Sequence, residues 1–354
     1  MNSIYDGFQP ASGGGWFAGA NTEAGFRGSY PDIAGERDLM RLYILKGGPG
    51  CGKSTLMRRV GEAAERAGHR AEYWLCGSDP DSLDAVILDG RAALVDGTAP
   101  HALDMACPGA SSELVDLSQF WDNGILSSAR EEIEARAAFK SAEFASAYRW
   151  LAAAGRILED EAVLARRMFL AEKAEGFAGR FVKRLGRPEG HGIAQRRYTH
   201  GVTMRGRRRT AGIEGEAEVT YSIEDAWGCA RLLLPVIAER MTRAGWDTVL
   251  GMLPLSGIIG GIRAGHFAVI CGGAGEHVIR MSRFVRSDPE VRGELRLAAK
   301  LRESCVSEAE AHLSRASREH FVLEEIYRGA MDFRAKERYE KKLTAWILDT
   351  LGRA

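Results

Sequence analysis

The residues best suited to chemistry lie in one glycine-rich segment, residues 47–55. Its spacing, G-x-x-x-x-G-K-S, is that of a phosphate-binding P-loop. Glycines let the backbone curl so that successive N–H groups point at phosphate oxygens without obstruction by side chains. In such a loop the lysine reaches the β- and γ-phosphates, and the serine hydroxyl binds Mg²⁺. We therefore expect ATP and Mg²⁺ to contact this segment, which comprises Gly47, Gly48, Pro49, Gly50, Cys51, Gly52, Lys53, Ser54 and Thr55.

The elements around this loop have the order that a P-loop requires. Residues 42–45 form an apolar run typical of a strand, and a helix is predicted from Lys53 to about Ala67, with Gly68 as its C-cap. The positive N-terminal end of that helix points at the same place as the loop amides. Residues 71–76 are predicted to form a second strand, and residues 77–84 a turn and the start of a helix.

A short apolar run at residues 91–96 ends in Asp96. A carboxylate at the end of such a strand faces the P-loop and holds water on Mg²⁺, as in a Walker B strand. We therefore expect Asp96 to act with Lys53 in catalysis and to bind Mg²⁺ with Ser54. The alternative is that Asp96 only caps the turn at Gly97.

The glutamate that usually follows the Walker B aspartate in hydrolytic enzymes is replaced by Gly97. Asp79 and Asp81, at the end of the neighbouring strand, are the alternative carboxylates for orienting water or accepting a hydroxyl proton. Asp79 is therefore a candidate catalytic residue. Both aspartates could equally cap the helix predicted to follow.

Composition predicts a globular cytoplasmic protein. The chain has 354 residues, zero net charge, and six scattered cysteines without a CxxC pair, which suits a reducing compartment. Its N-terminus lacks the pattern of a signal peptide. Its most apolar region, residues 250–275, is interrupted by Pro254, Arg263 and His266, so we expect buried strands there and no membrane span. The histidines show neither HxxxH nor HExxH, and we expect no metal ion bound by the protein alone.

The second half of the chain repeats patterns of the first half. A Thr-x-x-Gly pattern at residues 22–25 recurs at residues 203–206, and an Arg-Ala-Gly helix end at residues 66–68 recurs at residues 243–245. Strands are predicted at residues 247–253 and 266–271. Apolar residues spaced three or four positions apart predict a helical hairpin over residues 126–183. The helices predicted at residues 289–352 match it.

We therefore expect an α/β fold of two tandem P-loop NTPase-like three-layer domains, each followed by a helical hairpin. The first domain is predicted at residues 15–187, with helices over about 126–187. The second is predicted at residues 188–354, with helices over about 286–354.

The second copy is predicted to be degenerate, because its loop, residues 224–231, lacks the phosphate-binding residues. Ala230 stands in place of the lysine, and Glu224 and Asp225 put negative charge where phosphate would bind. Cys271 stands in place of the Walker B aspartate.

A basic segment lies between the halves. We consider three interpretations: a solvated linker, an arginine placed over the γ-phosphate by the second half, or a patch for an anionic partner such as nucleic acid. Against the single acidic residue Glu189, the segment contains Arg180, Lys183, Arg184, Arg187, Arg196, Arg197, Arg205, Arg207, Arg208 and Arg209.

Four runs together resemble a known family. They are Phe-Ala-x-x-Asn-Thr at residues 17–22, the loop with its flanks at 44–57, Cys-x-Ser-Asp-x-Asp-Ser-Leu-Asp at 76–84, and Asp-Gly-Thr-Ala-Pro-His at 96–101. The chain resembles uncharacterised bacterial P-loop ATPases found mostly in Gram-positive anaerobes and spore-formers. This resemblance implies a P-loop domain followed by helices in each half, and ATP as the ligand. The sequence departs from the family pattern in its second loop.

Three functions follow from these patterns. The leading one is an ATPase with one Mg²⁺-dependent site in the first half. The second is a nucleotide or small-molecule kinase, since Gly-Gly-Pro-Gly-x-Gly-Lys resembles nucleoside monophosphate kinase loops and the missing glutamate suits transfer to a hydroxyl. The third is a non-hydrolysing ATP-gated module that binds nucleic acid or protein.

Cys51 allows a smaller prediction. A thiol inside the loop, at a helix N-terminus, could have increased thiolate character. The alternative is that it occupies an ordinary variable position of the loop.

Overall fold

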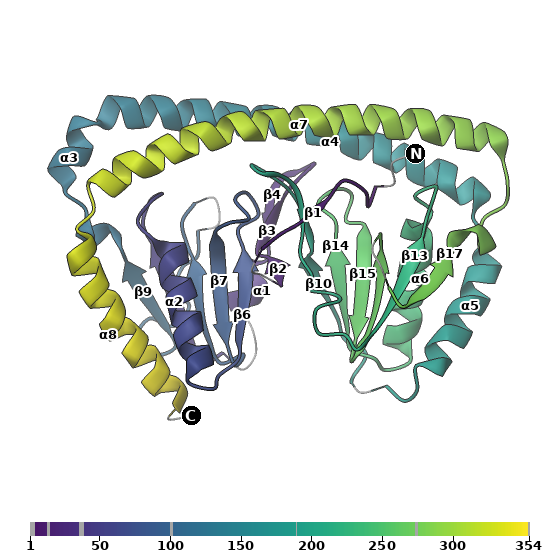
Figure 1. Cartoon of the computed structure of the whole chain (residues 1–354), viewed down its shortest axis with the longest axis horizontal. Helices are drawn as coiled ribbons and strands as arrows, with labels where there is room; N and C mark the ends of the chain where they lie inside the picture. The colour runs from purple at the N-terminus through teal and green to yellow at the C-terminus, as the bar shows by residue number, and fades with distance from the viewer. Residues whose placement is uncertain are drawn as a thin grey trace.

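The computed structural model describes residues 4–12, 15–34, 39–99, 102–188, 190–272 and 275–352. Pro100 and His101, the end of the 96–101 motif, lie outside these ranges, as does Glu189 of the basic segment. The described residues form a mixed α/β structure with a twelve-stranded sheet and eight α-helices (Figure 1). No helix among them is long and apolar enough to cross a membrane.

The large sheet consists of two six-stranded halves with the same strand order. The first half contains, in spatial order, β2 (Trp16–Phe17), β6 (Ala71–Leu75), β7 (Leu83–Leu88), β8 (Ala92–Asp96), β5 (Arg41–Lys46) and β9 (Ser112–Asp116). The second contains, in the same sense, β10 (Ala194–Tyr198), β14 (Thr248–Met252), β15 (Ile259–Ala264), β16 (Phe267–Cys271), β13 (Val219–Glu224) and β17 (His277–Arg280). The order of parallel and antiparallel strand pairs is the same in both halves. The two halves are joined by β2 and β10, which pair antiparallel.

Two hairpins lie beside the centre of the sheet. The first is formed by β3 (Gly19–Thr22) and β4 (Gly25–Gly28), the second by β11 (His200–Thr203) and β12 (Gly206–Arg209), with β1 (Gln9–Pro10) added to β12. The repeated Thr-x-x-Gly pattern makes the same turn in both, because each threonine hydroxyl donates to the carbonyl of its glycine, at 2.7 Å in the first and 2.6 Å in the second. Asn21 Nδ2 donates to the Val202 carbonyl at 2.9 Å and ties the hairpins together.

The helices exchange partners between the halves. They are α1 (Tyr30–Ala34), α2 (Lys53–Arg66), α3 (Asn123–Ser128), α4 (Arg130–Met168), α5 (Ala171–Arg184), α6 (Ala230–Arg243), α7 (Pro289–Gly329) and α8 (Phe333–Gly352), with short 3₁₀ turns η1 (Ser118–Phe120) and η2 (Met281–Arg283). The long helices α4 and α7 pack against each other and span both halves (Figure 1). Beyond them, α5 packs on α6 of the second half, whereas α8 packs on α2 of the first.

The predicted local helical hairpin over residues 126–183 is therefore wrong. One helix of 39 residues, α4, takes its place, and at 1.5 Å per residue it is about 58 Å long. It is long enough to carry the chain across both halves, and its apolar positions are buried against α7 instead of α5.

The helix predicted to begin in residues 77–84 is also wrong, since the chain continues into β7. All six residues of that strand are buried between β6 and β8. Burial on both faces favours an apolar strand here, and the turn at residues 80–81 leads into it with no helix between them. The strands at β5, β8, β14 and β16 and the helix α2 lie where the sequence predicts them.

Candidate functional site

The glycine-rich loop leaves β5 and enters α2 through backbone conformations that favour glycine. Gly47, Gly50 and Gly52 have φ values of 144°, 71° and 82°. A Cβ atom on Gly47 would lie 2.7 Å from the Cys51 sulfur, so the loop is also too tight for a side chain. The three glycines shape a backbone curl at the positive end of α2, as a phosphate-binding loop requires.

Lys53, Ser54 and Asp96 converge at this loop. The Lys53 ammonium donates to the Gly47 carbonyl at 2.6 Å and lies 3.6 Å from Asp96 Oδ2. Strand β8 lies directly beside β5, and this pairing brings Asp96, at the end of β8, to the loop. The Ser54 hydroxyl accepts a hydrogen bond from the Leu83 amide at 2.9 Å, which fixes its orientation at the start of β7.

Asp84 is a buried carboxyl group that sequence reasoning missed. It accepts a hydrogen bond from the Tyr30 hydroxyl at 2.6 Å. Burial, followed by the charge of Asp96, raises the pKa of Asp84 to about 7. The sequence does carry a signal, since Asp84 precedes the apolar run 85–88, which pairs with β8, but the aspartates before this run also fit the start of a helix.

Asp79 is buried in the loop between β6 and β7. Its Oδ2 accepts from the Ser82 hydroxyl at 2.8 Å, as in a turn, while its Oδ1 has no hydrogen-bond partner. Arg205, from the tip of the β11–β12 hairpin, places Nε 3.8 Å from Asp79 and 3.5 Å from Asp81. Asp79 thus lines the cavity with this oxygen buried, whereas Asp81 is largely exposed.

The C-terminal helices α7 and α8 cover the loop, a contribution that sequence reasoning did not find. A Cβ on Gly50 would lie 2.6 Å from the backbone oxygen of Glu324, and one on Gly52 would lie 2.6 Å from the Lys336 ammonium. Lys336 is buried and forms a short ion pair with Glu340. These residues follow the loop by more than half of the chain, so no local pattern links them to it.

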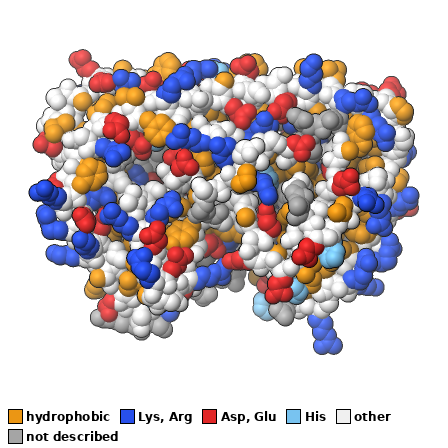
Figure 2. Space-filling model, viewed as in Figure 1, with side chains coloured by type: hydrophobic (Ala, Val, Ile, Leu, Met, Phe, Trp, Pro, Cys, Tyr) orange, Lys and Arg blue, Asp and Glu red, His pale blue; other side chains and the backbone are white. Residues whose placement is uncertain are grey.

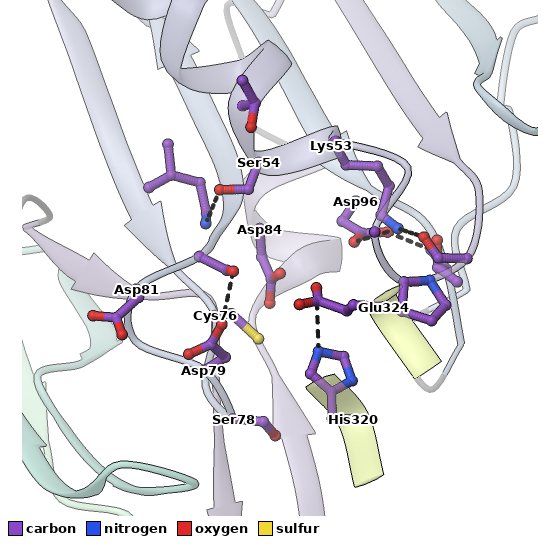
Figure 3. A pocket seen from close by; sticks show the side chains of 18 of the residues that line it. Lys53, Ser54, Cys76, Ser78, Asp79, Asp81, Asp84, Asp96, His320 and Glu324 are labelled. Atoms are coloured by element: carbon purple, nitrogen blue, oxygen red, sulfur yellow. Dashed lines mark hydrogen bonds and ion pairs between the residues drawn. The ribbon is translucent and has the colours of Figure 1, made fainter. Parts of the chain in front are cut away.

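These groups line one cavity with a volume of about 1260 Å³. Figure 3 shows the labelled carboxyl groups of Asp79, Asp84, Asp96 and Glu324 in this pocket, with Lys53 and His320 beside them. Aromatic side chains of β4 and α4 contribute Phe26, Phe144 and Tyr148 to the same lining. The cavity is therefore both charged at the loop and partly aromatic, a combination that fits a nucleotide.

Cys51 is buried, and burial raises the pKa of its thiol even though Lys53 lowers it. The prediction of increased thiolate character is wrong, because loss of solvation outweighs the helix N-terminus and the nearby lysine.

The loop of the second half is closed by its own carboxylate. Asp225 accepts hydrogen bonds from the amides of Trp227, Cys229 and Ala230 at 3.0, 3.1 and 2.7 Å. This aspartate occupies the N-terminal end of α6, where the first half has its glycine-rich loop at α2. Cys271, at the end of β16, is buried.

Several arginines of the basic segment are engaged within the molecule. The Arg197 guanidinium lies over the rings of Trp16 and Trp74, 5.0 and 4.9 Å from their centroids, and pairs with Glu72 at 2.9 Å. Arg207 pairs with Glu303 at 2.6 Å. Over the face seen in Figure 2, basic and acidic side chains are intermixed. The solvated-linker interpretation is wrong for Arg197 and Arg207, which belong to strands and have acidic partners.

Among the described residues, no group of three or more His, Cys, Asp or Glu side chains could hold a metal ion. The chain matches no model of a known protein family, no curated protein and no solved structure.

Proposed function

We propose that this chain binds ATP with Mg²⁺ at residues 47–55 and hydrolyses it at a single site. The observation that carries the proposal is the convergence of Lys53, Ser54 and Asp96 at the end of paired strands β5 and β8. A strand, a glycine curl and a helix N-terminus meet there, and together these features recognise phosphate chains.

The donor set fits Mg²⁺ bound together with a nucleotide. Mg²⁺ is usually held by one or two carboxylates, waters and substrate phosphates, so a dedicated cluster of protein ligands is not needed. Ser54 and Asp96 would hold it, and the ion would neutralise charge on the phosphate oxygens. The glycine curl supplies the cradle, because a Cβ would fill it at Gly47.

The chain's own residues have distinct roles in this proposal. The loop amides and the Lys53 ammonium bind the phosphate oxygens and stabilise the charge that grows on them during transfer. The ion pair of Lys53 with Asp96 keeps the ammonium at the loop. Helices α7 and α8 cover the cavity from the opposite side, which limits the access of water to the phosphates.

The test compares Lys53→Ala with Lys342→Ala, an exposed lysine of α8. We expect the wild type and Lys342→Ala to bind and hydrolyse ATP in the presence of Mg²⁺, and Lys53→Ala to lose at least about 100-fold in turnover. Calorimetry measures binding and phosphate release measures turnover. A wild type that binds ATP tightly without turnover would instead support the gated module, and one that binds no ATP contradicts the proposal.

Phosphoryl transfer to a second substrate is a second candidate, favoured by the size of the cavity. Its 1260 Å³ exceeds the range of about 300–1,000 Å³ typical of single-ligand sites. Asp79 lines this space, and its buried Oδ1 makes no hydrogen bond within the described residues, so a side-chain rotation would be needed for it to accept a hydroxyl proton. Labelled ATP incubated with nucleosides, nucleoside monophosphates and small alcohols tests the idea; label in phosphate alone would exclude it for those acceptors.

We also propose that the two halves derive from one duplicated P-loop unit and that the second lost its phosphate site. The repeated strand order, the matching threonine turns and the Asp225-filled loop support this. We expect calorimetry to give one ATP per chain. A stoichiometry of two, with the second site insensitive to Lys53→Ala, would contradict the loss of the second site.

A further inference from the structure

A carboxylate from the second half reaches the phosphate loop of the first. Glu324 lies near the C-terminal end of α7 and lines the cavity that contains Lys53 and Asp96. The Gly50 amide hydrogen-bonds to this carboxylate, and the α7 backbone touches the same glycine. Glu324 therefore stands at the part of the loop that would surround the terminal phosphates.

Three other carboxylates of the cavity are engaged by neighbouring groups. Asp96 lies beside Lys53 and accepts from the Thr98 amide at 2.8 Å. Asp84 accepts from the Tyr30 hydroxyl at 2.6 Å. Asp79 accepts from the Ser82 hydroxyl and lies near Arg205. Glu324 differs from them because it pairs with a histidine of its own helix.

That histidine is His320, one helical turn before Glu324. Its Nε2 lies 3.6 Å from Glu324 Oε1, and Figure 3 shows the two side chains facing each other in the cavity. Burial, followed by Lys140, Lys53 and Arg205, lowers the pKa of His320 to about 4. A neutral imidazole carries no charge that would hold the Glu324 carboxylate in its ionised form, so the carboxylate stays basic.

We propose that Glu324 is the general base of the ATPase site. The inference rests on the ATPase function proposed above. Glu324 takes a proton from a water molecule while the water oxygen bonds to the γ-phosphorus. The bond between that phosphorus and the β–γ bridging oxygen breaks, and its electron pair leaves with ADP. The proton then passes from Glu324 to solvent, so ATP and water become ADP, inorganic phosphate and a proton.

The environment of Glu324 predicts a characteristic pH dependence. Burial, followed by Asp79, raises the pKa of Glu324, and Arg328 and the Gly50 amide oppose this rise. A base with a raised pKa loses activity at a higher pH than an ordinary glutamate as the solution is acidified. The titratable and charged groups that face Glu324 or its partner His320 are Glu325 and Arg328 on α7, Lys140 on α4, Asp79 before β7, Lys53 on α2 and Arg205 of the β11–β12 hairpin.

The test compares Glu324→Gln with Glu325→Gln, the same chemical change one residue further along α7 on an exposed side chain. We expect Glu324→Gln to bind Mg²⁺–ATP with an affinity within about threefold of the wild type and to hydrolyse it at least about 100-fold more slowly. Its residual hydrolysis rate should no longer fall as the solution is acidified. ATP recovered by chromatography from the Glu324→Gln protein should remain intact. Glu325→Gln should behave like the wild type.

Four outcomes would overturn the assignment. Wild-type turnover in Glu324→Gln excludes Glu324 as the base and leaves the ATPase proposal intact. Loss of ATP affinity comparable with that of Lys53→Ala shows a binding role instead. If the hydrolysis rate of Asp84→Asn no longer falls on acidification, while that of Glu324→Gln still does, the base is Asp84. A wild type without ATP binding rejects the ATPase proposal itself and the assignment with it.

Discussion

The Asp225 carboxylate accepts a hydrogen bond from the Ala230 amide at 2.7 Å and closes the loop before α6. In the first half the corresponding segment is the glycine-rich loop, and the carboxylate of Glu324 reaches its Gly50 amide from another helix. One loop thus has a carboxylate from its own sequence. The other has a carboxylate from a distant helix.

We expect Asp225→Ala to destabilise the protein without changing ATP affinity. The substitution leaves the amides of Trp227, Cys229 and Ala230 without their acceptor, as in loss of a helix N-cap, which costs about 1–2 kcal/mol. Urea unfolding measures the change, and Glu224→Ala, on an exposed neighbour, is the control. A large loss of ATP affinity in Asp225→Ala would show that the second loop contributes to the nucleotide site.

Asp84 should make stability fall as the pH rises. Its pKa is about 7 in the folded chain and about 4 when unfolded, so the folded state binds the extra proton between these values. The stabilisation is complete below about pH 4 and is lost as the pH rises through 7. Asp84→Asn keeps an acceptor for Tyr30 and stays neutral. We expect it to be a few kcal/mol more stable than the wild type at pH 8, and equal to it near pH 4, by urea unfolding across pH.

Lys336 should contribute to ATP affinity. Its buried ammonium lies at Gly52, where the helix N-terminus and loop amides converge. We expect Lys336→Met, which keeps the length of the side chain, to weaken ATP binding about tenfold, because one charged hydrogen bond is worth about 1.5–3 kcal/mol. Lys341→Met, on the exposed face of α8, serves as the control in calorimetry. Unchanged affinity in Lys336→Met would limit Lys336 to its pair with Glu340.

Cys51 should resist alkylation. Its thiol is buried with a raised pKa, whereas Cys107 is exposed. We expect iodoacetamide at neutral pH to label Cys107 and spare Cys51, as read by mass spectrometry of peptides. Rapid labelling of Cys51 in the folded protein would contradict its burial.

The sequence predicted the parts of the site that are local. Residues from Lys46 to Ser54 follow each other through strand, loop and helix, and Asp96 ends an apolar run whose pairing follows from its length and position. The repeated threonine turns were equally local. Strand β7 was interpreted wrongly because Asp79 to Asp84 resembles a helix cap, and burial on both faces outweighed that local preference.

The contribution of α7 and α8 could not be predicted in the same way. Glu324 and Lys336 reach the loop only because α4 runs past its own half and α7 returns beside it. Helical periodicity gives the buried face of each helix and does not say which helix covers it. The identity of the partner depends on long-range packing, for which one sequence carries no local signal.

The exchange of α5 and α8 between the halves has a consequence for synthesis. Domains usually fold as units, the N-terminal one first, as the chain leaves the ribosome. Here α2 is covered by α8, and the glycine-rich loop is covered by α7, so the first half awaits helices that are translated more than about 200 residues after the loop. A nascent chain that has already made residues 47–55 still lacks the walls of its cavity until α7 and α8 have been synthesised.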